Sequence, residues 1–288
     1  MTNPINEIQQ LYHRYRLLVF AMLMLLITAL ILVFLQRALV LPVLGAAVLF
    51  HLFLLRPCQK QYTNSVTRAN LMQTVCRTLG SDGPAQKGGT LITSDTIANS
   101  GLMPCGDENS QPLLCWEIQG KKKDMTLTLC DATIPQNFHL VEKGKKRVHF
   151  NAGVWIHLDL PADTQLHFKL IDETAVPTPI RMEYFSQKHT FETASVGDPD
   201  LGKRFVFYRP RDSRQQPSPA LLKKLRALME YTPGYVALGI NGSRMDVFIR
   251  GRFLARAVSA STRPSQALLD FDPLPELAYV VELADAVL

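Results

Sequence analysis

A long apolar stretch near the start of the chain, Leu17 to Leu55, constrains the fold more than any other feature. Its first run, residues 17–35, has nineteen residues without a charge. At 1.5 Å per residue, such a run gives about 28 Å of helix, and a bilayer core is about 30 Å thick. The second run, residues 38–55, is slightly shorter and carries Pro42 in its first turn, where a missing N–H costs little. We therefore expect two transmembrane helices, at about 17–35 and 38–55.

Two other interpretations of the stretch are a buried hairpin in a soluble core and an uncleaved signal peptide. A signal peptide has an apolar region of roughly 7–15 residues and a small-residue cleavage site, and this sequence has neither. A soluble hairpin needs a polar face along each helix, whereas both runs are apolar all round. The sequence favours a membrane hairpin in contact with the lipid bilayer.

Charge and cysteine usage predict which side of the membrane the remainder occupies. The basic residues flanking the two runs are His13, Arg14, Arg16, Arg56, Lys60 and Arg68. Only Arg37 lies between the runs, so the positive-inside rule places both termini in the cytoplasm. The five cysteines are odd in number and lack a CxxC spacing, which favours reduced thiols. We expect a multi-pass protein of the cell inner membrane whose main domain is cytoplasmic.

The roughly 230 residues after the hairpin suffice for one sizeable domain or two small ones. We expect a membrane anchor at 1–58, a juxtamembrane helix and loop at 59–89, and a cytoplasmic domain at 90–288. Helical spacing of apolar residues predicts amphipathic helices over 1–16, 59–79, 219–232 and 275–288. Ser218 is the expected N-cap of the third, with Pro219 as its first residue.

Between these helices the apolar period changes to two, which is typical of strands. The predicted strands are 113–118, 125–129, 138–141, 148–158, 165–171, 180–185, 203–208, 235–240 and 245–249. A turn at Gly120–Lys123 joins the first two, and a turn at Asn241-Gly242 joins the last two. Strands that come in hairpins with helices between them indicate an α+β domain, with a mainly antiparallel sheet and flanking helices.

The strand predicted at 148–158 and the residue after it carry the polar side chains that are the best candidates for a metal-binding or catalytic site. Trp155, His157 and Asp159 share one face with His149, and we expect this face to be solvated. His149 and His157 are about 26 Å apart in an extended strand and cannot share a metal ion. His157 with Asp159 could contribute two ligands, but a solvated face explains them equally well. We expect no metal ion and no cofactor, and we interpret Cys115 and Cys130 as buried apolar residues.

Familiar catalytic motifs are missing from the sequence. There is no GxSxG, GxxxxGK[ST], GxGxxG or HExxH pattern, so no catalytic or cofactor-binding residue is predicted. The basic residues of the predicted hairpin turns form a second candidate site, a surface that would contact the membrane or a partner. We expect these turns to lie at the same end of the sheet. These residues are Lys121, Lys122, Lys123, Lys143, Lys145, Lys146 and Arg147. Each cation near an anionic leaflet contributes about 1 kcal/mol of attraction.

Solvated turn charges are the alternative explanation of those lysines, and it applies equally to the positive stretch from Arg244 to Arg256. No nucleic acid is expected as a partner, because the clusters lack interleaved aromatic side chains.

Several loose motifs together resemble a known family. They are Ser100-Gly101-Leu102, Trp116-Glu117, the Phe150 to Asp159 strand, Phe205 to Tyr208, and Pro217 to Leu222. Following two adjoining spans, they resemble a family of bacterial two-span membrane proteins with a cytoplasmic α+β domain, classed as a domain of unknown function. The chain departs from that family in having Trp116-Glu117 in place of an acidic pair, and Arg209 to Gln216 in place of an aspartate-rich stretch. The resemblance implies no catalytic residues, and it implies a LemA-like membrane protein as a partner.

We therefore expect a membrane-anchored cytoplasmic module that binds or assembles with another membrane protein or with itself, without catalysis. The alternatives are a membrane-bound enzyme using the face around Trp155, His157 and Asp159, and a subunit that oligomerises through its spans.

Overall fold

The computed structural model describes residues 4–80, 86–87, 92–103, 112–122, 124–136, 141–142, 145–146, 149–172, 191–232, 234–252, 254, 259 and 262–288. The chain forms two compact units. The first contains residues 1–73 and 255–273, and the second contains residues 74–254 and 274–288. The domain boundaries expected at residues 58 and 89 stay predictions.

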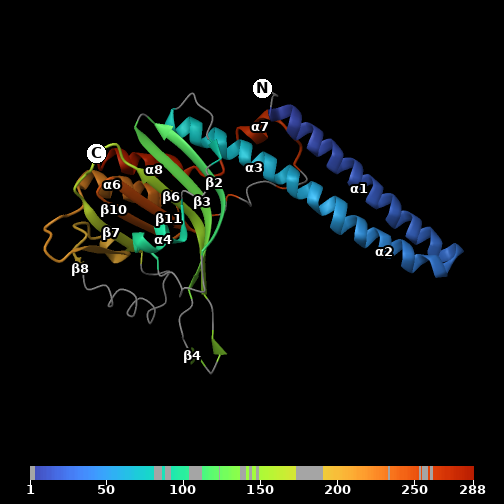
Figure 1. Cartoon of the computed structure of the whole chain (residues 1–288), viewed down its shortest axis with the longest axis horizontal. Helices are drawn as coiled ribbons and strands as arrows, with labels where there is room; N and C mark the ends of the chain where they lie inside the picture. Colours follow the sequence, from blue (N-terminus) through green and yellow to red (C-terminus); the bar gives the residue numbers. More distant parts are fainter. Residues whose placement is uncertain are drawn as a thin grey trace. The chain divides into compact units, whose positions relative to one another are not determined.

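The first unit is built on a hairpin of long helices whose arms lie side by side (Figure 1). Its elements are α1 (Pro4–Leu35), a 3₁₀ turn (Arg37–Leu39), α2 (Val40–Phe50), a π-helical turn (His51–Leu55) and most of α3 (Arg56–Leu79). The end of α3, from Thr74 onward, belongs to the second unit. Two apolar helices, Ile5–Leu35 and Val40–Leu79, are long enough to span a membrane, and they include nearly all of both expected spans. Most of their large apolar side chains are exposed.

The two arms also pack together before the first apolar run and after the second. Ile8 of α1 is buried with Tyr62 and Val66 of α3, and the ring of Tyr15 stacks on that of Tyr62. The Tyr62 hydroxyl donates a hydrogen bond to the carbonyl of Thr262, in the segment that contains α7 (Gln266–Leu269). The amphipathic pattern expected at 1–16 and the first part of that expected at 59–79 therefore pack against each other.

The second unit contains a nine-stranded sheet in the order β1-β2-β3-β6-β11-β10-β7-β9-β8. The strands are β1 (Gln86–Lys87), β2 (Leu113–Lys122), β3 (Met125–Gln136), β6 (His149–Asp159), β7 (His167–Asp172), β8 (Phe191–Ala194), β9 (Phe205–Pro210), β10 (Val236–Asn241) and β11 (Arg244–Arg250). A separate hairpin consists of β4 (Val141–Glu142) and β5 (Lys145–Lys146). All of the pairings are antiparallel between the strands described, which confirms the α+β class.

Helices α6 (Pro219–Tyr231) and α8 (Glu276–Asp285) lie on one side of the sheet, opposite α4 (Ser94–Ser100) (Figure 1). Ser218 caps α6 as predicted, because its side chain accepts a hydrogen bond from the amide of Leu221. The expected stripes of both helices are buried, except that Met229 is half-buried and Leu288 lies exposed beyond the end of α8. Gly242 has φ +61°, in the turn predicted between β10 and β11.

Three local expectations are wrong. Gly120 to Lys122 belong to β2 and not to a turn, because Gly120 lies against Val75 and Leu79 of α3, where a side chain would not fit. Cys115 is exposed, since the β2–β3 register shifts between Cys115 and Ile118 and Trp116 has φ +61°. The third error concerns the face of Trp155, described below. The strand expected at 180–185 lies outside the described residues.

Candidate functional site

The register of the sheet places two rows of mostly polar residues on one face. The first row, taken across β7, β10, β11, β6 and β3, is Lys169, Gly239, Asp246, His157 and Thr128. The second row, two positions further along the same strands, is His167, Asn241, Arg244, Asp159 and Thr126. Because side chains alternate between the faces of a strand, both rows point to the same side.

The rest of this face is covered by α4 and the residues that follow it. Ile97, Leu102 and Met103 are fully buried in one apolar cluster with Trp155 and Phe248. The segment is held to the sheet through Glu117, whose carboxylate accepts a hydrogen bond of 3.0 Å from the amide of Ile92. A face expected to be solvated is therefore largely internal.

Local sequence signals explain why α4 forms within a region of period two. Thr93 and Thr96 make a capping box, in which each side chain accepts a hydrogen bond from the other residue's amide. Gly101 ends the helix with φ +61°, a conformation that glycine adopts without strain. The helix is only seven residues long, so apolar periodicity alone could not have revealed it.

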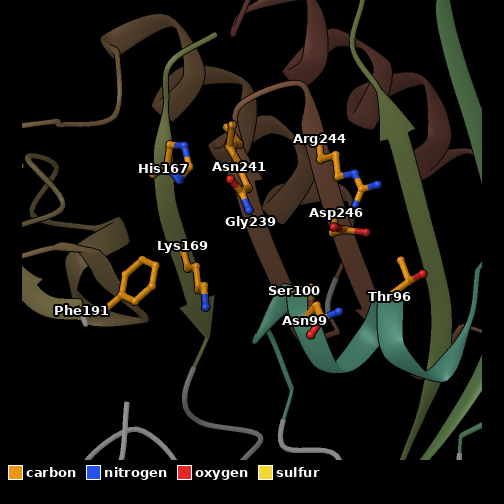
Figure 2. Close-up of a pocket in the computed structure, with 11 residues that line it drawn as sticks. Thr96, Asn99, Ser100, His167, Lys169, Phe191, Gly239, Asn241, Arg244 and Asp246 are labelled. Carbon is orange, nitrogen blue, oxygen red and sulfur yellow. The ribbon is translucent and has the colours of Figure 1, made fainter. Parts of the chain in front are cut away.

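A hollow of about 260 Å³ lies where the two polar rows meet the end of α4. Figure 2 shows Gly239 between Lys169 of β7 and Asp246 of β11, with α4 crossing in front of these strands. Glycine supplies no side chain there, and a Cβ at this position would lie 2.9 Å from Leu102 Cδ2. The hollow is lined by Thr96, Asn99, Ser100, His167, Lys169, Phe191, Gly239, Ile240, Asn241, Arg244 and Asp246.

Cationic side chains stand on both sides of the hollow. The ammonium nitrogen of Lys169 lies 4.4 Å from the centre of the Phe191 ring, a cation–π distance that fixes its position. Arg244 is exposed, on the other side of Asn241. Neighbouring strands are about 4.8 Å apart, so the backbones of Lys169 and Asp246, two strands apart, are separated by roughly 10 Å.

Asp246 is buried at the floor of the hollow and is held by two donors. The indole N–H of Trp155 donates to its Oδ1 at 3.0 Å, and His157 Nδ1 lies 2.8 Å from the same oxygen. The other ring nitrogen of His157 lies 3.3 Å from Asp159 Oδ1. His157 therefore bridges two carboxylates, an arrangement that stabilises its protonated form.

The electrostatic environment of His157 has opposing contributions. Burial by itself lowers its pKa, but the hydrogen bond and charge of Asp246, together with Asp159, raise the pKa above the usual value of 6.5. With His157 protonated, the group of His157, Asp159 and Asp246 carries one net negative charge. Among the described residues that line the hollow, Lys169 and Arg244 carry positive charges.

The hydroxyl groups beside the hollow already take part in the fold. Ser100 Oγ donates to the carbonyl of Ile97 at 2.7 Å, and Thr96 Oγ1 belongs to the capping box. Neither hydroxyl contacts a base that could activate it, within the residues that the structure describes. The arrangement suits noncovalent recognition by charge and hydrogen bonding.

The predicted polar residues are brought together, but their setting differs from the expectation. Trp155 is fully buried and His157 nearly so, because α4 covers this side of the sheet, and only Asp159 is exposed. Sequence reasoning missed Asp246, Lys169 and Gly239. A glycine and an aspartate in the middle of otherwise apolar strands were the available signals.

The basic residues predicted as a second surface do not share one end of the sheet. Lys121 and Lys122 end β2 beside the start of β3, whereas the connection carrying the other basic residues begins after Gln136, at the far end of β3. Successive turns of a meander lie at opposite ends of the sheet, so Lys121 and Lys122 are not at the end from which the β4–β5 connection departs. Lys121 is exposed, and Lys122 pairs with Asp285 at 3.1 Å. Lys145 and Lys146 form β5, while Lys123, Lys143 and Arg147 lie outside the described residues.

Comparisons with protein-family models, with curated proteins and with solved structures give no match for this chain. Among the residues with described positions, no group of three histidine, cysteine, aspartate or glutamate side chains could hold a metal ion.

Proposed function

We propose that this chain is a membrane-anchored binding module. In this proposal the apolar helices span the inner membrane, both termini and the α+β unit are cytoplasmic, and the unit binds a ligand or a partner without transforming it. The partner would be another membrane protein, of the LemA-like kind, or a second copy of the chain.

The observation that best supports the binding function is how the polar groups around the hollow are hydrogen-bonded. Asp246 is bound by Trp155 and His157, and His157 has a carboxylate at each ring nitrogen. A histidine with both ring nitrogens engaged is poorly placed to exchange protons with a substrate. Lys169 and Arg244 line the hollow and can attract an anionic ligand. This favours binding over the alternative of an enzyme that uses Trp155, His157 and Asp159.

The anchor and its orientation are tested in membranes. An alkaline carbonate wash should leave the protein in the membrane fraction, whereas a peripheral protein would be released. Reporter fusions that work only in the cytoplasm should be active at either terminus and inactive at Arg37. An active fusion at Arg37 would contradict the proposed topology.

The assembly is tested by cross-linking in cells, followed by purification in mild detergent and mass spectrometry. Stoichiometric recovery of a second membrane protein, or of a homo-oligomer, supports an assembly module. Recovery of a monomer alone would remove the protein partner from the proposal and leave only a ligand.

A further inference from the structure

We propose that the hollow centred on Gly239 binds a compact hydroxyl-bearing organic phosphate, such as a sugar phosphate. This inference rests on the proposed binding function and specifies the ligand class of the same site. It follows from the size of the hollow, the positive side chains that line it, and the position of the Asp246 carboxylate.

The volume of the hollow limits the size of the ligand. Ligand sites commonly enclose roughly 300–1,000 Å³, and this hollow, at about 260 Å³, is slightly smaller than that range. A nucleic-acid strand or a lipid tail would not be enclosed. A metabolite of the size of a phosphorylated monosaccharide matches the space.

The anionic part of the ligand is assigned to the side chains of Lys169 and Arg244. These come from β7 and β11, on opposite sides of β10, so an anion between them would be attracted from two directions. Asn241 and His167 lie in the same row as Arg244, and Asn99 lines the hollow from α4. Phosphate oxygens accept several charge-assisted hydrogen bonds at once, which suits such a set of donors.

The hydroxyl groups of the ligand are assigned to Asp246, at the floor of the hollow. Asp246 is only slightly exposed, but it lines the hollow, and its Oδ1 is the atom held by Trp155 and His157. Its second carboxylate oxygen, Oδ2, is the acceptor that would receive a ligand hydroxyl. Phe191 and Ile240 supply apolar surface on which the carbon face of a sugar can pack. An inorganic anion has no hydroxyl group for Asp246 to bind and no carbon face to pack on Phe191 and Ile240.

The test measures binding by calorimetry with the full-length protein in detergent, using glucose 6-phosphate, inorganic phosphate and glucose as probes. We expect glucose 6-phosphate to bind at least tenfold more tightly than inorganic phosphate, and glucose not to bind measurably. Lys169→Met and Arg244→Met should each weaken binding at least tenfold. Lys224→Met and Arg226→Met are matched controls, because both residues lie on α6 and neither lines the hollow, and these variants should bind as the unaltered protein does.

Other outcomes overturn the inference in identifiable ways. Equal affinity for inorganic phosphate and glucose 6-phosphate would remove the hydroxyl assignment. Unchanged affinity in Lys169→Met and Arg244→Met, with unchanged thermal stability, would place the ligand elsewhere. If no probe binds, the ligand class is wrong, whereas the proposed anchor and assembly are judged separately by the carbonate wash and the cross-linking.

Discussion

His157 and Asp246 meet across the β6–β11 pairing, with 2.8 Å between His157 Nδ1 and Asp246 Oδ1, although 89 positions separate them in the sequence. The same carboxylate oxygen accepts the indole N–H of Trp155. One aspartate therefore joins two strands and orders the floor of the hollow.

The first prediction concerns pH. Because the pKa of His157 is raised in the folded protein, its protonation stabilises the fold. This contribution should be fully present below the unfolded pKa, about 6.5, and should be lost as pH rises through the higher folded pKa. The measurement is the unfolding free energy of the unaltered protein and of His157→Gln across pH. The difference between them should shrink as pH rises, and a difference that grows with pH would contradict the assignment.

The second prediction concerns a buried ion pair. Asp172 is fully buried, and its Oδ2 lies 2.5 Å from Arg204 Nε, while Arg204 also donates to the carbonyl of Gly234. Arg204→Met removes a partner from a buried carboxylate and should cost about 3–5 kcal/mol. Lys203→Met is the control, since Lys203 and Asp200 pair at the exposed surface, where the loss should be below about 1 kcal/mol. The unfolding free energies are measured by denaturant titration. Similar losses of stability in the two variants would show that the buried ion pair contributes no more than the exposed one.

The third prediction concerns the contact between Gly120 and α3. A Cβ at Gly120 would lie 2.6 Å from Leu79 Cδ1 and closer still to Val75 Cγ1. Gly120→Ala should therefore destabilise the protein by about 1–3 kcal/mol through overpacking. Adding Val75→Ala should recover part of that loss, because it vacates the space. Gly202→Ala, which meets no atom within 4 Å, is the control; additive effects in the double variant would show that the two positions are not in contact.

The fourth prediction separates two cysteines. Cys115 is exposed, whereas Cys130 is fully buried, and burial raises the pKa of its thiol well above the usual range. A maleimide should modify Cys115 rapidly in the folded protein. Mass spectrometry should show that Cys115→Ser removes one fast-reacting thiol and that Cys130→Ser removes none. Fast loss of the Cys130 thiol would contradict its burial.

Local signals predicted a large part of the fold. The apolar runs predicted the hairpin, Ser218-Pro219 predicted the start of α6, and Asn241-Gly242 predicted the tight turn, because each depends on neighbours in the sequence. Gly120 was misread as a turn residue because its role depends on Val75 and Leu79, more than forty positions away. Propensity alone cannot detect such packing.

The candidate site was predictable only in part. Trp155, His157 and Asp159 were recognised as one polar face from their alternation along β6. Their solvation was misjudged because α4 is short and its capping residues lie in a segment that otherwise has strand periodicity. Asp246 and Lys169 could not be joined to this face from the sequence, since their neighbours are set by the strand order β6-β11-β10-β7.

Residue 239, which lines the hollow, has only a hydrogen atom where any other residue has a carbon. Every missense change of a single nucleotide in a glycine codon encodes a residue with a Cβ. At this position that atom would enter the space held by Leu102. The coding sequence is therefore one nucleotide away from a residue that would press on a buried core side chain beneath the hollow, so the packing of α4 on the sheet requires glycine at this position.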